Sequence, residues 1–281
     1  MKKLLPTSVR LFSILHYSAA VVLAAGLFVL ADNAVASEFA LAISPPRFEL
    51  QIKPGERSRN VLEITNASAE TTALTVKTAD WSLGADNSVT FYDELQPESC
   101  RPWIAIERRE LSVAGGKPYR FRFEVSVPAD AKPQECRAAI MLEGQEQVTK
   151  AAGGLDIPFS ARIGVIVYIA VGGAEPNLSI IGAEIQTING KPTPVLMVRN
   201  TGTAHGRLSG FLSGTDASKS ALEFTAATSP ILAGETRPIP LSATRVGDPD
   251  TLVDVKFPVT ITGKLEWGKG KTQAIAQRFA L

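Results

Sequence analysis

The clearest pattern in the chain is a strict alternation of apolar and polar side chains over residues 155–168. Apolar side chains occupy the odd-numbered positions from Leu155 to Val167, and the even-numbered positions up to Gly164 are polar or small. A repeat of two residues predicts a β-strand with one apolar face. Pro158 has no N–H for a neighbouring strand, which favours a place at the edge of a sheet. Because an apolar edge strand invites another chain to pair with it, the stretch is typical of a binding strand.

Short alternating runs separated by turn residues fill the rest of the chain, and we find no convincing amphipathic helical pattern. This pattern predicts an all-β protein. Six further strands are expected before residue 155, over residues 40–52, 59–65, 72–81, 103–113, 119–127 and 136–143. Seven short strands at this spacing favour a sandwich of the immunoglobulin type.

A turn-rich stretch, residues 171–176, interrupts the alternation and predicts a domain boundary. Alternating runs then resume over residues 178–188, 194–200, 206–213, 222–232, 236–243, 256–267 and 272–279. A second, smaller β-sandwich fits this half. The expected fold is therefore all-β, with two immunoglobulin-like β-sandwich domains in tandem, residues 37–171 and 172–281.

The first residues have the pattern of an export signal. Three basic residues, Lys2, Lys3 and Arg10, precede an apolar run over residues 19–31, and Ala34-Val35-Ala36 supplies the small residues of a cleavage site. The run is shorter than the roughly 20 residues of a membrane-spanning helix. We therefore predict that residues 1–36 are a cleaved signal peptide, and that the mature protein is exported and does not span a membrane.

Charge and cysteine content narrow the functional classes. The formal net charge is only +1 and no polybasic cluster occurs, which argues against a nucleic-acid partner. The two cysteines, Cys100 and Cys136, predict one structural disulfide in an oxidising compartment. A redox or metal pair would need closer spacing or further ligands.

The sequence offers little for catalysis. Signal cleavage leaves His205 as the one histidine, in a turn-like stretch where a solvated loop side chain is expected. Gly270-Lys271-Thr272 matches the end of a phosphate-binding loop, but Leu265 stands where that motif needs glycine. We predict no catalytic residue, no metal site and no cofactor. An extended peptide added to the edge strand is the interaction that the pattern favours.

Over nearly its whole mature length, the chain resembles the periplasmic chaperones of the chaperone-usher pilus pathway. The resemblance rests on the Pro46-Arg47 pair near the mature start and on the run over residues 162–165, Arg-Ile-Gly-Val. It implies that the last strand of the first domain lends apolar side chains to an incomplete pilin fold. The residues that match this donor strand are Leu155, Ile157, Phe159 and Ile163.

The resemblance also implies an anchor for the terminal carboxylate of the client. Arg47 stands where the family has an arginine in the cleft between the domains. The family's second basic residue, a lysine, aligns with Gly164, and the nearest basic residue is Arg162, about 7 Å away along a strand. A guanidinium can bind a carboxylate bidentately, so Arg47 and Arg162 are the predicted anchor. The Cys100–Cys136 pair differs from the best-known members and indicates a divergent branch.

The leading hypothesis is a non-enzymatic periplasmic chaperone for a secreted pilin-like subunit. The sequence leaves open whether an outer-membrane usher takes part and whether the empty protein dimerises. The alternative is a structural or adhesive envelope β-sandwich protein without a client, and a hydrolase with an unrecognised site is a third. A structural protein should bury Leu155, Ile157 and Phe159 in its own core, whereas a chaperone should leave at least some of them exposed.

Overall fold

The computed structural model describes residues 40–97, 99–145, 147–150 and 155–281, without the side chains of residues 147–150 and 157–159. The predicted signal peptide, residues 1–36, lies outside the described residues. Residues Phe39–Leu281 form one compact unit. Within the described part of the chain, the only helix is a short 3-10 turn, η1 (Arg101–Trp103), so the predicted all-β class is confirmed.

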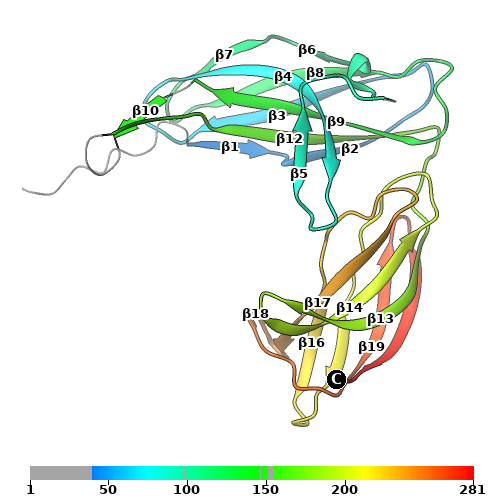
Figure 1. Cartoon of the computed structure of the whole chain (residues 1–281). Helices are drawn as coiled ribbons and strands as arrows, with labels where there is room; N and C mark the ends of the chain where they lie inside the picture. Colours follow the sequence, from blue (N-terminus) through cyan, green and yellow to red (C-terminus); the bar gives the residue numbers. More distant parts are fainter. Residues whose placement is uncertain (1–39, 98, 146, 151–154) are drawn as a thin grey trace, which may run out of the picture. The chain divides into compact units, whose positions relative to one another are not determined.

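The first half of the chain forms two layers of strands (Figure 1). One sheet contains, in spatial order, β1 (Leu41–Ser44), β3 (Arg57–Asn66), β8 (Pro118–Ser126) and β6 (Ile104–Ile106). The other contains β2 (Arg47–Ile52), β12 (Arg162–Val171), β9 (Glu135–Gly144), β4 (Thr72–Leu83) and β5 (Val89–Tyr92), with β7 (Glu110–Val113) beside β4. The hairpin of β10 (Gln147–Lys150) and β11 (Asp156–Phe159) forms a separate two-stranded sheet.

The alternation in β8 shows how the sequence builds this sandwich. Phe121, Phe123 and Val125 are buried, whereas Arg120 and Arg122 between them are exposed. Successive side chains of a strand point to opposite faces, so one face of β8 joins the core and the other meets water. The buried face packs in a cluster to which both sheets contribute.

The second half forms one sheet that folds around its own core. Its strands are, in spatial order, β13 (Leu178–Ile188), β14 (Lys191–Asn200), β17 (Thr236–Arg245), β16 (Ala221–Ala226), β15 (Leu212–Thr215), β19 (Val259–Trp267) and β20 (Lys271–Phe279), with β18 (Asp248–Leu252) beside β17. β17 pairs with β14 up to Pro240 and with β16 from Leu241 onward, so the sheet changes layer there.

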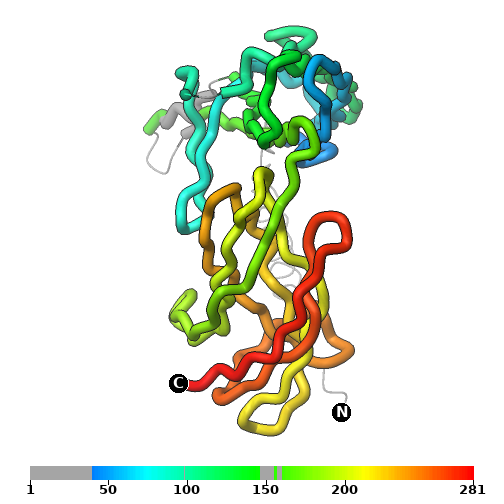
Figure 2. The backbone as a smooth tube through the Cα atoms, turned by 90° about the vertical axis from the view of Figure 1, so that its right-hand side faces the viewer, coloured from blue at the N-terminus to red at the C-terminus, as the bar shows by residue number. Residues whose placement is uncertain are grey.

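The two ends of this sheet approach each other, because the Ile180 N–H of β13 donates to Gln273 Oε1 of β20 at 3.0 Å (Figure 2). The strands therefore enclose a second core, separate from the first. The predicted pair of immunoglobulin-like sandwiches in tandem is confirmed.

The prediction of one continuous strand over residues 155–168 is wrong, because these residues form parts of two strands, β11 and β12. β11 pairs with β10, whereas β12 pairs with β9, and Ser160 and Ala161 lie between β11 and β12 outside both ladders. The change of partner ends one strand and begins the next.

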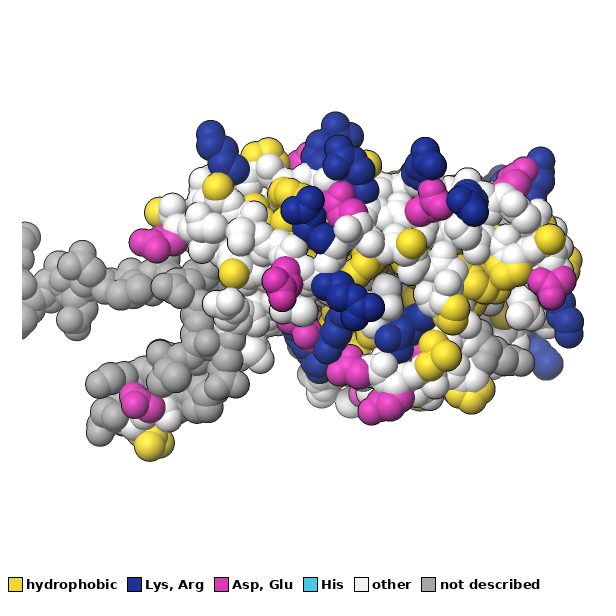
Figure 3. All heavy atoms as spheres, turned by 90° about the horizontal axis from the view of Figure 1, so that it is seen from above, with side chains coloured by type: hydrophobic (Ala, Val, Ile, Leu, Met, Phe, Trp, Pro, Cys, Tyr) yellow, Lys and Arg dark blue, Asp and Glu magenta, His cyan; other side chains and the backbone are white. Residues whose placement is uncertain are grey.

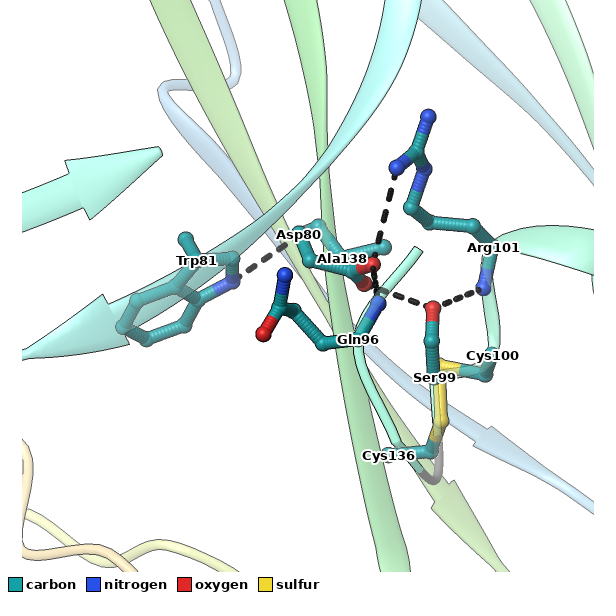
Figure 4. Close-up of a disulfide and its surroundings, with 8 residues drawn as sticks. All are labelled: Asp80, Trp81, Gln96, Ser99, Cys100, Arg101, Cys136 and Ala138. Carbon is teal, nitrogen blue, oxygen red and sulfur yellow. Dashed lines mark hydrogen bonds and ion pairs between the residues drawn. A yellow bond between two sulfur atoms is a disulfide. The ribbon is translucent and has the colours of Figure 1, made fainter. Parts of the chain in front are cut away.

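The predicted disulfide is confirmed. Cys100 and Cys136 are bonded across a sequence separation of 36 residues, with their Cα atoms 5.9 Å apart (Figure 4). The bridge ties the residue before η1 to the start of β9. Beside it, the buried carboxylate of Asp80 accepts hydrogen bonds from the Gln96 N–H at 2.9 Å and the Ser99 hydroxyl at 2.6 Å. The segment between β5 and η1 is thus fixed by a covalent bond and a buried carboxylate.

Candidate functional site

One edge of β12 is partly open. On one side, β12 pairs with β9 over residues 162–170. On the other side, it pairs in parallel with β2 only from Ile166, which lies opposite Arg47. Among the described residues, no strand pairs with this second side of residues 162–165.

The direction of the backbone groups on this edge follows from one hydrogen bond. Gly144 N–H donates to the Ala161 carbonyl at 2.9 Å, so the backbone groups of Ala161 point toward β9. The N–H and C=O groups of successive residues in a strand point to opposite sides. The backbone groups of Arg162 and Gly164 therefore point to the open side, where they can pair with an added strand.

The open edge results from a change of sheet between β1 and β2. β1 pairs with β3 in one sheet, and β2 pairs with β12 in the other. Pro45 and Pro46 separate the two strands and have no N–H to contribute to either ladder. Because the chain crosses between the layers at these residues, the place beside residues 162–165 is left empty of a strand among the described residues.

The predicted donor positions lie in different surroundings. Leu155, just before β11, has an exposed fraction of 67%. The side chains of Ile157 and Phe159 lie outside the described residues, although their backbone forms β11. Ile163 is partly buried and packs against the first core. Leu155 is therefore the donor position whose exposure the structure describes.

The two predicted anchor arginines lie on the same face of the sheet but apart along it. Arg47 Nε donates to Glu49 Oε1 at 2.7 Å, and both side chains are about half-exposed. Arg162 is exposed and lies opposite Glu143 of β9. It stands four residues before Ile166, the neighbour of Arg47, which is about 13 Å along the strand.

Gly164, between these arginines, has no room for a side chain. A Cβ atom there would lie 2.3 Å from the Cζ atom of Phe91, which comes from β5. The ring of Phe91 therefore covers the position that aligns with the family's lysine.

A pocket of about 400 Å³ lies next to Arg47. Its charged and aromatic lining comes from β2, β9, β12 and the loop after β14: Arg47, Glu49, Glu135, Tyr168, His205 and Arg207. Of these six residues, only Arg47 was predicted from the sequence to bind a client. The other residues are far apart in the sequence and meet only through the fold.

His205 is a buried member of this cluster, so the prediction of a solvated loop histidine is wrong. Its side chain is 8% exposed, its Nδ1 atom lies 2.5 Å from Glu135 Oε2, and its ring stacks on Tyr168 at 3.8 Å. Its Nε2 atom lies 3.6 Å from Glu49 Oε1. Burial alone would lower the pKa of His205, but the contacts with Glu135 and Glu49 outweigh it and raise the pKa above its ordinary value.

Glu49 and Arg207 complete the cluster. The contact with His205 is the largest cause that holds the pKa of Glu49 at about 2, against partial burial, with Arg47 adding to the effect. Arg207 Nε lies 3.6 Å from Glu49 Oε1. Arg207 also donates to the Thr228 carbonyl at 2.7 Å and to the Tyr168 hydroxyl at 3.3 Å. These bonds fix the Arg207 guanidinium at the pocket wall.

The raised pKa of His205 predicts a pH-dependent stability. Glu135 of β9, Glu49 of β2, Tyr168 of β12 and Arg207 from its own loop face the ring. The stabilisation is present below the ordinary histidine pKa of about 6.5 and is lost as the pH rises through the folded-state value. We expect the free energy of unfolding, measured in urea, to fall between pH 6 and pH 9 more in the wild type than in His205→Gln. Equal slopes for the two proteins would contradict the assignment.

Other chemistry has little support in the described part of the chain. No group of three or more His, Cys, Asp or Glu side chains there could hold a metal ion. No helix of the described residues is long and apolar enough to cross a membrane. On the face drawn in Figure 3, Lys and Arg side chains lie among Asp and Glu side chains without one continuous basic patch.

Among known proteins, only solved structures are similar to this chain. No protein-family profile matches the chain. No curated protein matches it. Solved structures similar to the chain include the Salmonella enterica SafA pilin in complex with the SafB chaperone, with 12% identity, 87% of this chain and 98% of that chain covered, and a TM-score of 0.44.

Two further similar structures come from other bacteria. The CsuC-CsuE chaperone-tip adhesion subunit pre-assembly complex of Acinetobacter baumannii has 14% identity, covers 86% of this chain and 98% of that chain, and has a TM-score of 0.43. The Pseudomonas aeruginosa CupB2 chaperone has 8% identity, covers 85% and 100%, and has a TM-score of 0.42.

Proposed function

We propose that the protein is a periplasmic chaperone that binds secreted, pilin-like subunits by lending them the open edge of β12 together with β11. The observation that carries the proposal is the side of residues 162–165 that no described strand covers, together with the exposed Leu155 before it. An incomplete β-sandwich has unpaired backbone groups and exposed apolar surface, and a lent strand covers both. The exposure of Leu155 favours this function over a structural sandwich that buries its own edge.

The position of Arg47 gives the added strand a direction. A client strand beside residues 162–165 would lie in line with β2 and end where β2 begins, at Arg47. A guanidinium favours a carboxylate over an amino terminus. The client strand would therefore run parallel to β12, with its C-terminal carboxylate at Arg47, about 13 Å along β12 from the predicted second anchor Arg162.

The protein would act in the periplasm, where it would meet its partners. Cleavage after Ala36 would leave the two sandwiches, residues 37–171 and 172–281, in the periplasm. The client is a secreted β-rich subunit, and an outer-membrane usher is a second candidate partner. The empty edge could be covered by dimerisation with a second copy, since unpaired edges invite pairing. The proposal assigns no catalytic residue.

A backbone variant tests strand addition. Arg162→Pro removes an N–H donor on the open side without breaking the ladder with β9, whereas Arg162→Ala removes only the side chain. Tagged proteins would be recovered from the host periplasm and their stoichiometric partners identified by mass spectrometry. We expect Arg162→Pro to lose most of the client that Arg162→Ala retains, with both proteins equally folded by circular dichroism.

A second pair of variants tests the contribution of apolar surface to client binding. Leu155→Glu should reduce client recovery several-fold, because it places a charge where apolar surface would be covered. Leu252→Glu is the control, since Leu252 is 71% exposed on the second sandwich. Equal recovery with Arg162→Pro, Leu155→Glu and the wild type would overturn the proposed function.

A further inference from the structure

The pocket beside Arg47 already holds one carboxylate, that of Glu49. Three cationic groups surround its Oε1 atom: Arg47 Nε at 2.7 Å, His205 Nε2 at 3.6 Å and Arg207 Nε at 3.6 Å. Arg47 belongs to the first sandwich, and His205 and Arg207 belong to the loop between β14 and β15. The fold therefore gathers cations from distant parts of the chain around one carboxylate position.

The cations retain capacity for a second carboxylate. In the described part of the chain, Glu49 is the only partner of the Arg47 guanidinium, through Nε, so its two terminal nitrogens remain available. Arg207 Nε is buried without a hydrogen-bond partner. The Glu49 side chain is 46% exposed, so it can turn toward water when another carboxylate enters. The pocket of about 400 Å³ provides the space.

Charge balance also favours an incoming anion. With a protonated His205, the pocket holds three positive groups, Arg47, His205 and Arg207, against the carboxylates of Glu49 and Glu135. Three positive charges against two negative ones leave a net positive charge, which attracts an incoming carboxylate. Because a buried uncompensated charge is costly, binding should weaken as His205 loses its proton.

We propose that Arg207 and His205, in place of Arg162, act with Arg47 to hold the C-terminal carboxylate of the client in this pocket. The inference rests on the proposed function. Arg162 does not line the pocket, and Phe91 covers Gly164, so β12 offers no second cation beside Arg47. The second sandwich supplies it instead. Glu49 then acts as an internal competitor that occupies the site until a client arrives.

The test uses N-acetylglycine as a probe, with N-acetylglycinamide as the uncharged match. Binding to the full chain would be followed by NMR through the ring signals of His205, which are assigned by their absence in His205→Gln. We expect saturable shifts with the carboxylate only, with a Kd that rises with pH. Loss of one charge-assisted hydrogen bond should make binding about tenfold weaker in Arg207→Gln.

Further variants distinguish Arg207 from Arg162 as the second residue that holds the carboxylate. Glu49→Gln should tighten binding of N-acetylglycine, because it removes the competing charge. The exposed Arg199 of β14 gives the control Arg199→Gln, which should bind like the wild type. Loss of binding with Arg162→Gln but not with Arg207→Gln would overturn the inference, as would equal shifts with the amide.

The two proposals can fail separately. If Arg162→Pro loses the client while Arg207→Gln retains both client and probe, strand addition stands and the pocket assignment falls. If Arg207→Gln loses the probe while Arg162→Pro retains the client, the carboxylate pocket stands and strand addition falls.

Discussion

Replacement of both Cys100 and Cys136 by alanine is expected to lower the free energy of unfolding by roughly 4 kcal/mol. The bridge closes a loop across 36 residues and removes the corresponding freedom from the unfolded chain. A loss of this size raises the unfolded fraction about a thousandfold. It is a large share of the roughly 5–15 kcal/mol by which domains are stable. We expect this loss to arise mainly from the greater freedom of the unfolded chain. Both cysteines are buried, and the smaller alanine side chain fits at either position without a clash.

Urea unfolding of the oxidised wild type, the reduced wild type and the double alanine variant would measure this effect. Reduction of the wild type should bring its midpoint close to that of the variant, whereas the variant should not respond to reductant. A variant that unfolds within about 1 kcal/mol of the oxidised wild type would show that the bridge contributes little.

The sequence predicted well those strands that have one buried face. Residues 119–127 were expected as a strand, and β8 spans Pro118–Ser126, because strict alternation leaves one register that buries Phe121 and Phe123. The disulfide was predictable because the chain contains only two cysteines. These features depend on local pattern or on counting, and neither needs knowledge of distant contacts.

Other strands were not predicted correctly, because their formation depends on pairing with other segments of the chain. Residues 206–213 were expected as a strand, but only their end joins β15 (Leu212–Thr215), and the rest forms a loop with two isolated bridges, at Gly206 and Ser209. Within this stretch, the apolar Phe211 is 84% exposed. The short strands β5, β10 and β18 also escaped prediction, since a run of four or five residues carries little periodic signal.

The candidate site was predicted only in part. Arg47 was assigned from a motif, whereas Glu49, Glu135, Tyr168, His205 and Arg207 meet through long-range packing. His205 looked solvated because its neighbours in the sequence are turn-like, and its burial results from Glu135 and Tyr168 in the other sandwich. The one local signal was the pairing of Arg47 and Glu49 on the same face of a strand, and it does not identify the partners across the pocket.

Asn66 is expected to be among the most sensitive residues of the first sandwich. It lies at the end of β3, is fully buried, and uses both ends of its amide. Its Nδ2 group donates to the carbonyls of Glu70 at 2.7 Å and Val113 at 2.9 Å, and its Oδ1 atom accepts from Ser68 N–H and Oγ–H at 3.0 and 2.8 Å. These four bonds hold the turn that follows β3.

The second sandwich repeats this arrangement. Asn200 ends β14, is fully buried, and donates to the carbonyls of Ala204 at 2.8 Å and Ile231 at 2.9 Å. Its Oδ1 atom accepts from the N–H groups of Asn177 at 3.1 Å and Gly202 at 2.9 Å. Each asparagine thus connects the end of a strand to two other segments. The same device fixes the turn after the strand in both sandwiches.

Alanine at either position should leave several polar groups without partners, at about 1–3 kcal/mol for each group that water cannot reach. We expect Asn66→Ala and Asn200→Ala each to lower the free energy of unfolding by about 3–5 kcal/mol. Asn60→Ala is the matched control on β3, because Asn60 is only half-buried and bonds within its own strand, to Ser58. Its cost should stay below about 1 kcal/mol. In urea unfolding followed by tryptophan fluorescence, equal losses for Asn60→Ala and Asn66→Ala would show that strand pairing, and not the buried amide, holds these turns.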